Sequence, residues 1–304
     1  MLQARHMLAY NLAYLGELTA AREHAQQGIA LYDPKYHSLA FSISGDDPGV
    51  CCFCFQALAF WALGYPDQAL ESVYDAISLA ENLSHPLSFA LALTFAAIVH
   101  QLRRESEAVQ GRADACITLC TDQGFPFFLA LGKIMQGWAL AQKGEADGIK
   151  QMFEGLSAYR ATGADSFRPY HLSLIAEGHS ALGHPDEALH AIWEALDWIE
   201  HADERFYESE VYRLKGTLVL QSEKTSGESR LGLQTPSPRT GIEAETFFRK
   251  AIDASHASKT LNLTSYAQQF VWTACWGNEA IATRRGPCSS ASITGLPKGS
   301  IPPT

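Results

Sequence analysis

The chain has 304 residues, of which 47% are hydrophobic and 18% are charged, and its formal net charge is -10. This composition supplies enough apolar surface for an extensive core and excludes a wholly disordered chain. The acidic balance, without a cluster of Lys and Arg, argues against direct binding to nucleic acid, which needs concentrated positive charge. No run reaches the roughly 18 uninterrupted apolar residues of a membrane span. We therefore expect a soluble, cytoplasmic protein that does not bind membranes.

A short turn phrase recurs along the chain and is the main signal of its fold. The two clearest copies, Leu63 to Leu70 and Leu182 to Leu189, both read Leu-Gly-x-Pro-Asp-x-Ala-Leu. In each copy Gly ends one helix, Pro and Asp begin the next, and Ala lets the two helices pack closely. Each copy therefore predicts a hairpin of two helices. Weaker copies are centred near Ala21, Ala108, Ile149 and Ala244.

The copies taken in chain order predict about six hairpins with a period of about 40 residues, against about 34 in a standard tetratricopeptide repeat. We therefore predict an all-α fold in which residues 1–262 form a tetratricopeptide-like solenoid, wound as a right-handed superhelix. Residues 31–46 form a longer connection. It is followed by a helix that Asp47 caps and Pro48 begins.

The C-terminal part of the chain breaks this pattern. Residues 221–241 are rich in Ser, Thr, Gly and Pro and are predicted to form a mobile loop between the helices of the sixth hairpin. Residues 263–283 are interpreted as a degenerate helical remnant, and residues 284–304 as a disordered tail. No polar capping helix is visible, so this end looks like the remnant of a truncated or frame-shifted array. Open solenoid ends would favour self-association.

Several short runs occur together, in the same order, in one family of proteins. They are Asp47 to Val50, Trp61 to Leu70, His85-Pro86, His100 to Glu105, Gln123 to Phe125, Gly137 to Ala141, Thr162 to Ala164, Arg168 to Tyr170 and Arg213 to Gly216. On these runs, residues 20–261 resemble the C-terminal tetratricopeptide-like region of bacterial multidomain signalling ATPases, which are often fused to adenylate or guanylate cyclase or DNA-binding regulator domains. The resemblance implies a role in signal transduction. Any ATPase or cyclase activity would lie in an upstream domain that this chain lacks.

The sequence contains none of the common motifs for nucleotide binding, metal-dependent proteolysis or serine-hydrolase catalysis. The chain has no Walker phosphate loop, no dinucleotide-binding Gly-x-Gly-x-x-Gly, no His-Glu-x-x-His and no Gly-x-Ser-x-Gly. Cys116 and Cys120 could present two thiolates on one helical face, but no second pair completes a metal site, so we interpret them as core residues. Cys51, Cys52 and Cys54 receive the same interpretation. We therefore expect no catalytic residue, no metal and no cofactor.

A binding face can be projected from the repeat. Tetratricopeptide arrays bind partners on a concave face made by the first helix of each hairpin, where aromatic and Arg side chains suit anchoring. The projected partner-binding residues are Trp61, His100, Trp138, Arg168, Tyr170, Glu177, Glu210 and Arg213.

Structural alternatives remain open for five of these residues. Trp61 and Trp138 also fit the core between helices. Glu210 and Arg213 are three residues apart and are interpreted first as an ordinary surface ion pair, worth at most about 1 kcal/mol. Arg168 could clamp a carboxylate of a ligand, although packing at a repeat junction explains it as well.

Three functions follow as hypotheses. The first is a non-catalytic module that binds a protein, a peptide, a sibling domain or a small effector and regulates an attached domain. The second is an enzyme with an unrecognised pocket, using Glu177 with His179 or the region of Arg168. The third is a DNA-acting regulator that works through a missing domain.

Overall fold

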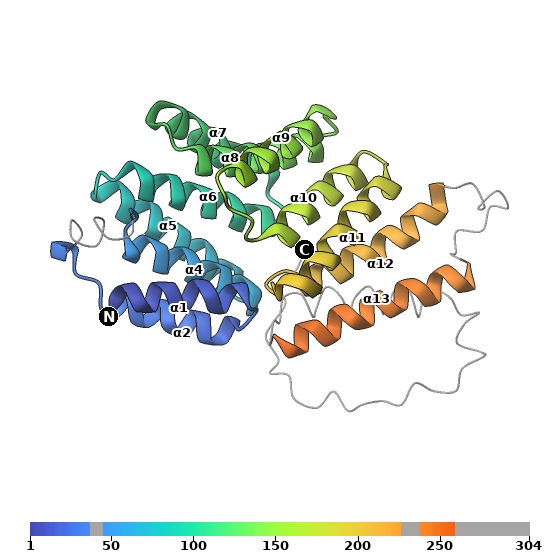
Figure 1. The fold of residues 1–304 in the computed structure, drawn as a ribbon, viewed down its shortest axis with the longest axis horizontal. Helices are drawn as coiled ribbons and strands as arrows, with labels where there is room; N and C mark the ends of the chain where they lie inside the picture. The colour runs from blue at the N-terminus through green and yellow to red at the C-terminus, as the bar shows by residue number, and fades with distance from the viewer. Residues whose placement is uncertain (37–44, 226–236, 259–304) are drawn as a thin grey trace, which may run out of the picture.

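The computed structural model describes residues 1–36, 45–225 and 237–258. The described residues form helices and connecting turns and contain no strand, so the predicted all-α class is confirmed. Figure 1 shows the helices following one another around an arc, from α1 and α2 in blue to α12 and α13 in orange. None of the described helices is both long and apolar enough to cross a lipid bilayer.

Successive helices of the described chain pack against each other in pairs, and the two helices of each pair follow one another in the sequence. The first helices of the pairs are α1 (Leu2–Tyr14), α4 (Pro48–Ala62), α6 (Pro86–Leu102), α8 (Pro126–Gln142), α10 (Arg168–Ala181) and α12 (Glu208–Thr225). Their partners are α2 (Leu18–Ala30), α5 (Pro66–Asn82), α7 (Ser106–Gln123), α9 (Asp147–Ala161), α11 (Pro185–Ala202) and α13 (Pro238–Ala257). A short 3-10 helix, η1 (Pro34–Tyr36), lies between α2 and α4.

The pairs stack so that their first helices form one layer. In this inner layer α4 contacts α1 and α6, and the contacts continue from α6 to α8, from α8 to α10 and from α10 to α12. Each second helix contacts its own partner, and all of them except α13, the last described helix, also contact the next first helix along the chain. Most residues of α4 and α6 are buried, because these helices have neighbours within the layer as well as outer partners. The packing is consistent with a helical repeat.

The turn phrase produces the geometry that its residues predict. Gly64 and Gly183 follow α4 and α10 with φ angles of 92° and 79°, in the left-handed region that favours glycine. Pro66 and Pro185 are the first residues of α5 and α11. A proline is suited to this position because its missing N–H would have no partner within the helix.

The start of α4 is also as predicted. One carboxylate oxygen of Asp47 accepts hydrogen bonds from the backbone N–H groups of Gly49 (2.9 Å) and Val50 (3.0 Å), and Pro48 is the first helical residue. The side chain therefore satisfies two of the donors that a helix leaves unpaired at its N-terminus.

The predicted loop of residues 221–241 is wrong at both ends. Helix α12 continues to Thr225 and α13 already begins at Pro238. Two hydrogen bonds from the backbone N–H of Ser237 to the Glu223 carboxylate (2.9 and 3.1 Å) join the two helix ends, and the Ser237 hydroxyl caps α13. Residues 226–236 lie outside the described residues. The remnant predicted at 263–283 and the tail predicted at 284–304 lie outside them too.

The first pair of helices contacts the far end of the array. The backbone N–H groups of Arg205 and Phe206, just before α12, donate to the carbonyl oxygen of Tyr14 at 2.9 and 3.3 Å. The ring of Phe167, before α10, lies edge-on to the rings of Tyr10 and Tyr14. In Figure 1 the first pair accordingly lies beside the start of α12. The first pair of helices and the start of α12 thus meet beside the inner layer, whose first helices the sequence had predicted to form a concave face.

Glu204 lies at this closing contact and gives the fold a predicted pH dependence. The residue is 1% exposed, and burial raises the pKa of its carboxyl from 4.5 to about 7, although the Trp198 indole donates to it at 3.1 Å. A raised pKa in the folded state means that folding favours the neutral acid. The protonated Glu204 side chain therefore stabilises the folded state fully below pH 4.5, and this stabilisation is lost as the pH rises through 7.

We expect Glu204→Gln to remove this dependence, because an amide cannot ionise. Denaturant unfolding near pH 5 and near pH 8 measures the free energy of unfolding of both proteins. Between these pH values the wild type should lose about 2 to 3 kcal/mol relative to the variant. Parallel pH profiles for the two proteins would show that Glu204 is ionised in the folded state and would contradict the prediction.

Candidate functional site

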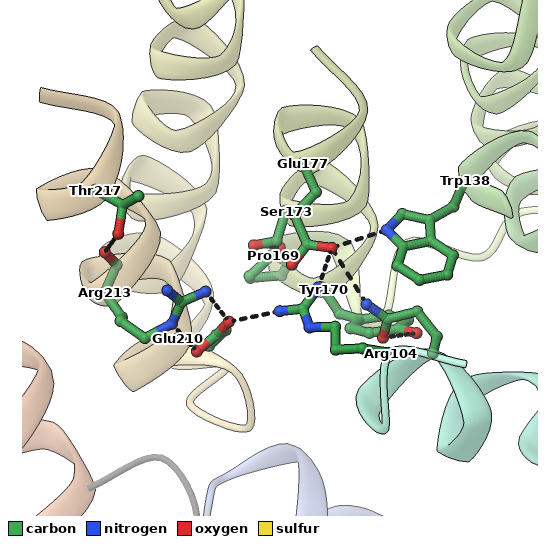
Figure 2. A network of polar contacts seen from close by, with 10 residues as sticks. Arg104, Trp138, Pro169, Tyr170, Ser173, Glu177, Glu210, Arg213 and Thr217 are labelled. Carbon is green, nitrogen blue, oxygen red and sulfur yellow. Dashed lines mark hydrogen bonds and ion pairs between the residues drawn. The ribbon is translucent and has the colours of Figure 1, made fainter. Parts of the chain in front are cut away.

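Side chains from α6, α8, α10 and α12 converge on two buried carboxylates inside the inner layer (Figure 2). The first carboxylate belongs to Glu177 of α10. Its Oε2 atom accepts hydrogen bonds from Arg104 Nη1 at 2.5 Å, from Trp138 Nε1 at 2.8 Å and from Gln101 Nε2 at 3.4 Å. Its Oε1 atom is buried and has no hydrogen-bond partner. One oxygen of Glu177 is therefore crowded with donors and the other has none.

The second carboxylate belongs to Glu210 of α12. It accepts from Arg213 Nε at 2.7 Å and Nη2 at 2.6 Å, and from Arg104 Nη2 at 3.2 Å. The side chains of Glu177 and Glu210 are 7% and 5% exposed, whereas that of Arg104 is 47% exposed. Arg104 therefore bridges two buried carboxylates from the side that faces solvent.

The amide of Gln101 extends this group of contacts, which we call the buried network. Gln101 is 0% exposed, donates to Glu177 and accepts from the hydroxyl of Tyr170 at 3.0 Å. Burial, together with the charge of Glu177, raises the pKa of Tyr170 well above its usual value, so the hydroxyl keeps its proton. Gln101 thus connects the neutral phenol to the charged carboxylate through a single side chain.

The charges of the buried network balance, with two guanidinium groups against two carboxylates. Burial alone would lower the pKa of Arg104, but the negative charges around it, with Glu177 first, outweigh burial and raise it. Desolvating such a group is costly, and removing one partner leaves an uncompensated buried charge. The network therefore ties the turn after α6 to α10 and α12.

A cavity of about 390 Å³ adjoins the buried network, and we call it the network cavity. Its charged lining residues are Arg104, Glu177, Glu210 and Arg213, and its apolar lining residues include Trp61, Leu102, Leu214 and Leu218. Its volume lies within the range of about 300 to 1,000 Å³ that is typical of ligand pockets. The cavity can accommodate a large side chain or a small molecule.

Six of the eight residues projected from the sequence lie at this place. Trp61, Glu177, Glu210 and Arg213 line the network cavity. Trp138 and Tyr170 lie behind it at 1% and 2% exposure and hold the buried network by their polar atoms. The core interpretation of Trp138 therefore agrees with its burial. The interpretation of Glu210 and Arg213 as a surface ion pair is wrong, since their side chains are 5% and 11% exposed.

The other two projected residues lie elsewhere. His100 faces α5, with Nδ1 2.6 Å from a carboxylate oxygen of Glu105 and Nε2 3.3 Å from the hydroxyl of Tyr74. Arg168 donates to Glu194 at 2.5 Å and lies 4.5 Å above the ring of Trp198. Arg168, the first residue of α10, therefore clamps a carboxylate of α11, its partner helix in the same pair, so the contact lies within a pair and not at the predicted junction between repeats.

Sequence reasoning missed Arg104 and Gln101 as site residues. Arg104 has a φ angle of 64°, and it stands in its turn where the equivalent turns carry Gly64, Gly144 and Gly183. A non-glycine residue costs roughly 1–2 kcal/mol in this conformation. Strain of this kind is typical of functional positions. The sequence signal that could have identified Arg104 as a site residue is thus an Arg at a turn position where the equivalent turns have glycine.

A second hollow, the aromatic cavity, has a volume of about 350 Å³ and lies in another part of the interior. Its lining is dominated by the rings of Phe55, Phe95, Phe127, Phe128, Phe167 and Phe206. The polar side chains of His6 and Asp46 and the thiol of Cys51 also line it. The ring of Tyr170 belongs to the same wall, while its hydroxyl belongs to the buried network.

Comparison of the chain with models of protein families gives no match, and comparison with proteins of curated function gives none either. The site must therefore be interpreted from its own geometry.

Proposed function

We propose that this chain is a non-catalytic binding module whose inner layer holds a peptide segment in the network cavity. The observation that carries the proposal is the arrangement of the cavity, which combines two guanidinium groups and two carboxylates with an apolar wall. Such a surface can pair with either sign of charge on a peptide and with an apolar side chain beside it. The fold proposed with it is a right-handed tetratricopeptide-like solenoid with a period of about 40 residues.

Binding is favoured over catalysis by the chemistry of this cavity. Its lining contains no His, Cys or Lys, and its hydroxyl groups of Ser180 and Thr217 donate to the Gln221 amide oxygen and to the Arg213 carbonyl oxygen, neither of which is a base that could activate them. Its carboxylates already accept hydrogen bonds from Arg and Trp side chains. A charge that is paired in this way serves recognition better than proton transfer.

The proposed setting is regulatory. The resemblance of the short runs between Asp47 and Gly216 to those of bacterial signalling ATPases supports a role in signal transduction in the cytoplasm, beside a nucleotide-binding, cyclase or DNA-binding domain. Arg104 offers a route for the signal because it joins the turn after α6 to both α10 and α12. A peptide that competes for either carboxylate would loosen that connection.

The test uses short random peptides displayed on phage and selected on the purified chain. The affinity of one enriched peptide, synthesised free, is then measured by calorimetry against the wild type and Ala181→Trp. Ala181 is exposed at the end of α10 and lines the network cavity, so a large side chain there blocks the opening without entering the core. We expect binding to weaken by at least about tenfold, or about 1.4 kcal/mol.

Ala158→Trp is the matched control. Ala158 is an exposed alanine in α9, the second helix of its pair, and does not line the network cavity. This variant should bind as the wild type does. Equal binding by the two tryptophan variants, or a selection that enriches no peptide, would refute the proposal.

A further inference from the structure

Three potential metal ligands meet on the wall of the aromatic cavity. His6 comes from α1, Asp46 from the residues before α4, and Cys51 from the first turns of α4. One ligand atom from each, an imidazole nitrogen, a carboxylate oxygen and the thiol sulfur, lies within 4.8 Å of the other two. The packing of α1 on α4 brings these residues together although His6 and Asp46 are 40 positions apart in the sequence.

We propose that His6, Asp46 and Cys51 bind one divalent cation of the zinc class on the wall of the aromatic cavity. Zn²⁺ is bound in proteins by Cys sulfur, His nitrogen and carboxylate oxygen, and this site offers one of each. The thiolate selects against Mg²⁺ and Ca²⁺, which prefer oxygen ligands alone.

The geometry is close to what a tetrahedral ion needs. Bonds of about 2.0–2.3 Å place the ligand atoms of such an ion roughly 3.3–3.8 Å apart. The observed limit of 4.8 Å therefore requires the atoms to close by about 1.5 Å at most, which side-chain rotation can supply. Three protein ligands leave the fourth position for water or for a donor atom of a molecule in the cavity.

The His6 side chain points independently to a bound ligand. It is 7% exposed, and its Nδ1 atom is buried without a hydrogen-bond partner. An unsatisfied buried polar atom is costly, and such atoms are rare in folded proteins.

The thiol of Cys51 is compatible with the same role. It is 1% exposed, and its sulfur atom lies within 4.8 Å of the ligand atoms of His6 and Asp46. On coordination the thiol proton passes to solvent and the sulfur binds as thiolate. The nearest rival in the described chain is the pair Cys116 and Cys120, whose sulfur atoms are 3.8 Å apart but which supplies only two ligands.

Cobalt(II) is the probe that tests the site. The metal-stripped full chain is titrated with Co²⁺, and the near-ultraviolet absorption of a thiolate bound to cobalt is recorded. We expect one cobalt ion per chain, displaced by Zn²⁺. Cys51→Ser should abolish the thiolate band, and His6→Gln should weaken cobalt binding by at least about tenfold, since each removes a direct ligand.

Cys120→Ser is the matched control, because it changes a buried thiol of the rival pair and should leave the titration unaltered. If circular dichroism shows that Cys51→Ser does not fold, Asp46→Asn replaces it, since Asp46 is only partly buried, and cobalt binding should again weaken. No thiolate band in the wild type, a band that survives Cys51→Ser or Asp46→Asn unchanged, or a band lost in Cys120→Ser would each overturn the site. The result is independent of peptide binding in the network cavity.

Discussion

Arg104→Met is expected to lower the free energy of unfolding by about 3 kcal/mol. Methionine keeps most of the aliphatic stem but removes the charge that neutralises Glu177 and Glu210, whose side chains are 7% and 5% exposed. Removing one partner of a buried ion pair typically costs about 3–5 kcal/mol. We expect a loss at the lower end of this range because the Arg104 side chain is 47% exposed and water screens part of its charge. Urea unfolding followed by circular dichroism measures the change.

Two comparisons make the prediction specific. Lys150→Met removes a cation from the exposed pair with Glu154, whose side chains are 78% and 60% exposed, and should cost no more than about 0.5 kcal/mol. Glu177→Gln, added to Arg104→Met, removes one of the uncompensated charges, so the double variant should be more stable than the sum of the single effects predicts. Additive effects would show that Arg104 and Glu177 do not interact in the folded protein.

The buried network explains why stability and binding are expected to be linked here. Buried ion pairs are often no more stabilising than apolar side chains of similar size, so their presence is weak support for a purely structural role. Arg104 also has a strained backbone, with a φ angle of 64°. A glycine would relieve that strain, as it does at Gly144 in the equivalent turn, but it would lose the contacts to both carboxylates. The side chain of Arg104 is thus kept at the cost of backbone strain, which is compatible with the recognition role proposed for it.

Local sequence signals predicted the elements of the fold well. The capping of α4 by Asp47 and the paired turns at Gly64 and Gly183 depend on a few neighbouring residues, and the structure has them as predicted. The limits of the connection between α12 and α13 could not be read from composition. Its Ser, Gly and Pro residues favour a loop, but the contact of Ser237 with Glu223 extends the order at both ends.

Contacts between distant parts of the chain were beyond sequence reasoning. Nothing near Tyr14 indicates that its carbonyl oxygen accepts from Arg205, yet this contact joins the first pair of helices to the start of α12. The same holds for His6 and Cys51, which were interpreted separately or not at all. The projected positions of Glu177 and Glu210 were useful because helical periodicity fixes a face. It does not show which cation lies opposite them.

Gly137→Ala is the second substitution with a large expected effect. Helices α8 and α9 cross at Gly137, where a Cβ atom would lie 2.6 Å from the carbonyl oxygen of Gly148 and 2.8 Å from Met152 Cγ. The first of these is a backbone atom and cannot rotate away, so the helices must separate. We expect a loss of about 3 kcal/mol, the upper end of the usual cost of overpacking, measured by urea unfolding.

Gly111→Ala is the control that isolates this contact. Gly111 also lies within a helix, α7, but an added Cβ atom would meet nothing within 4 Å. Alanine should therefore stabilise the protein by about 0.5–1 kcal/mol through helix propensity alone. If both variants gained stability, the close crossing of α8 and α9 would be wrong. The position of Trp138, the next residue along α8, would then be in doubt as well, and with it the hydrogen bond that holds Glu177 at the network cavity.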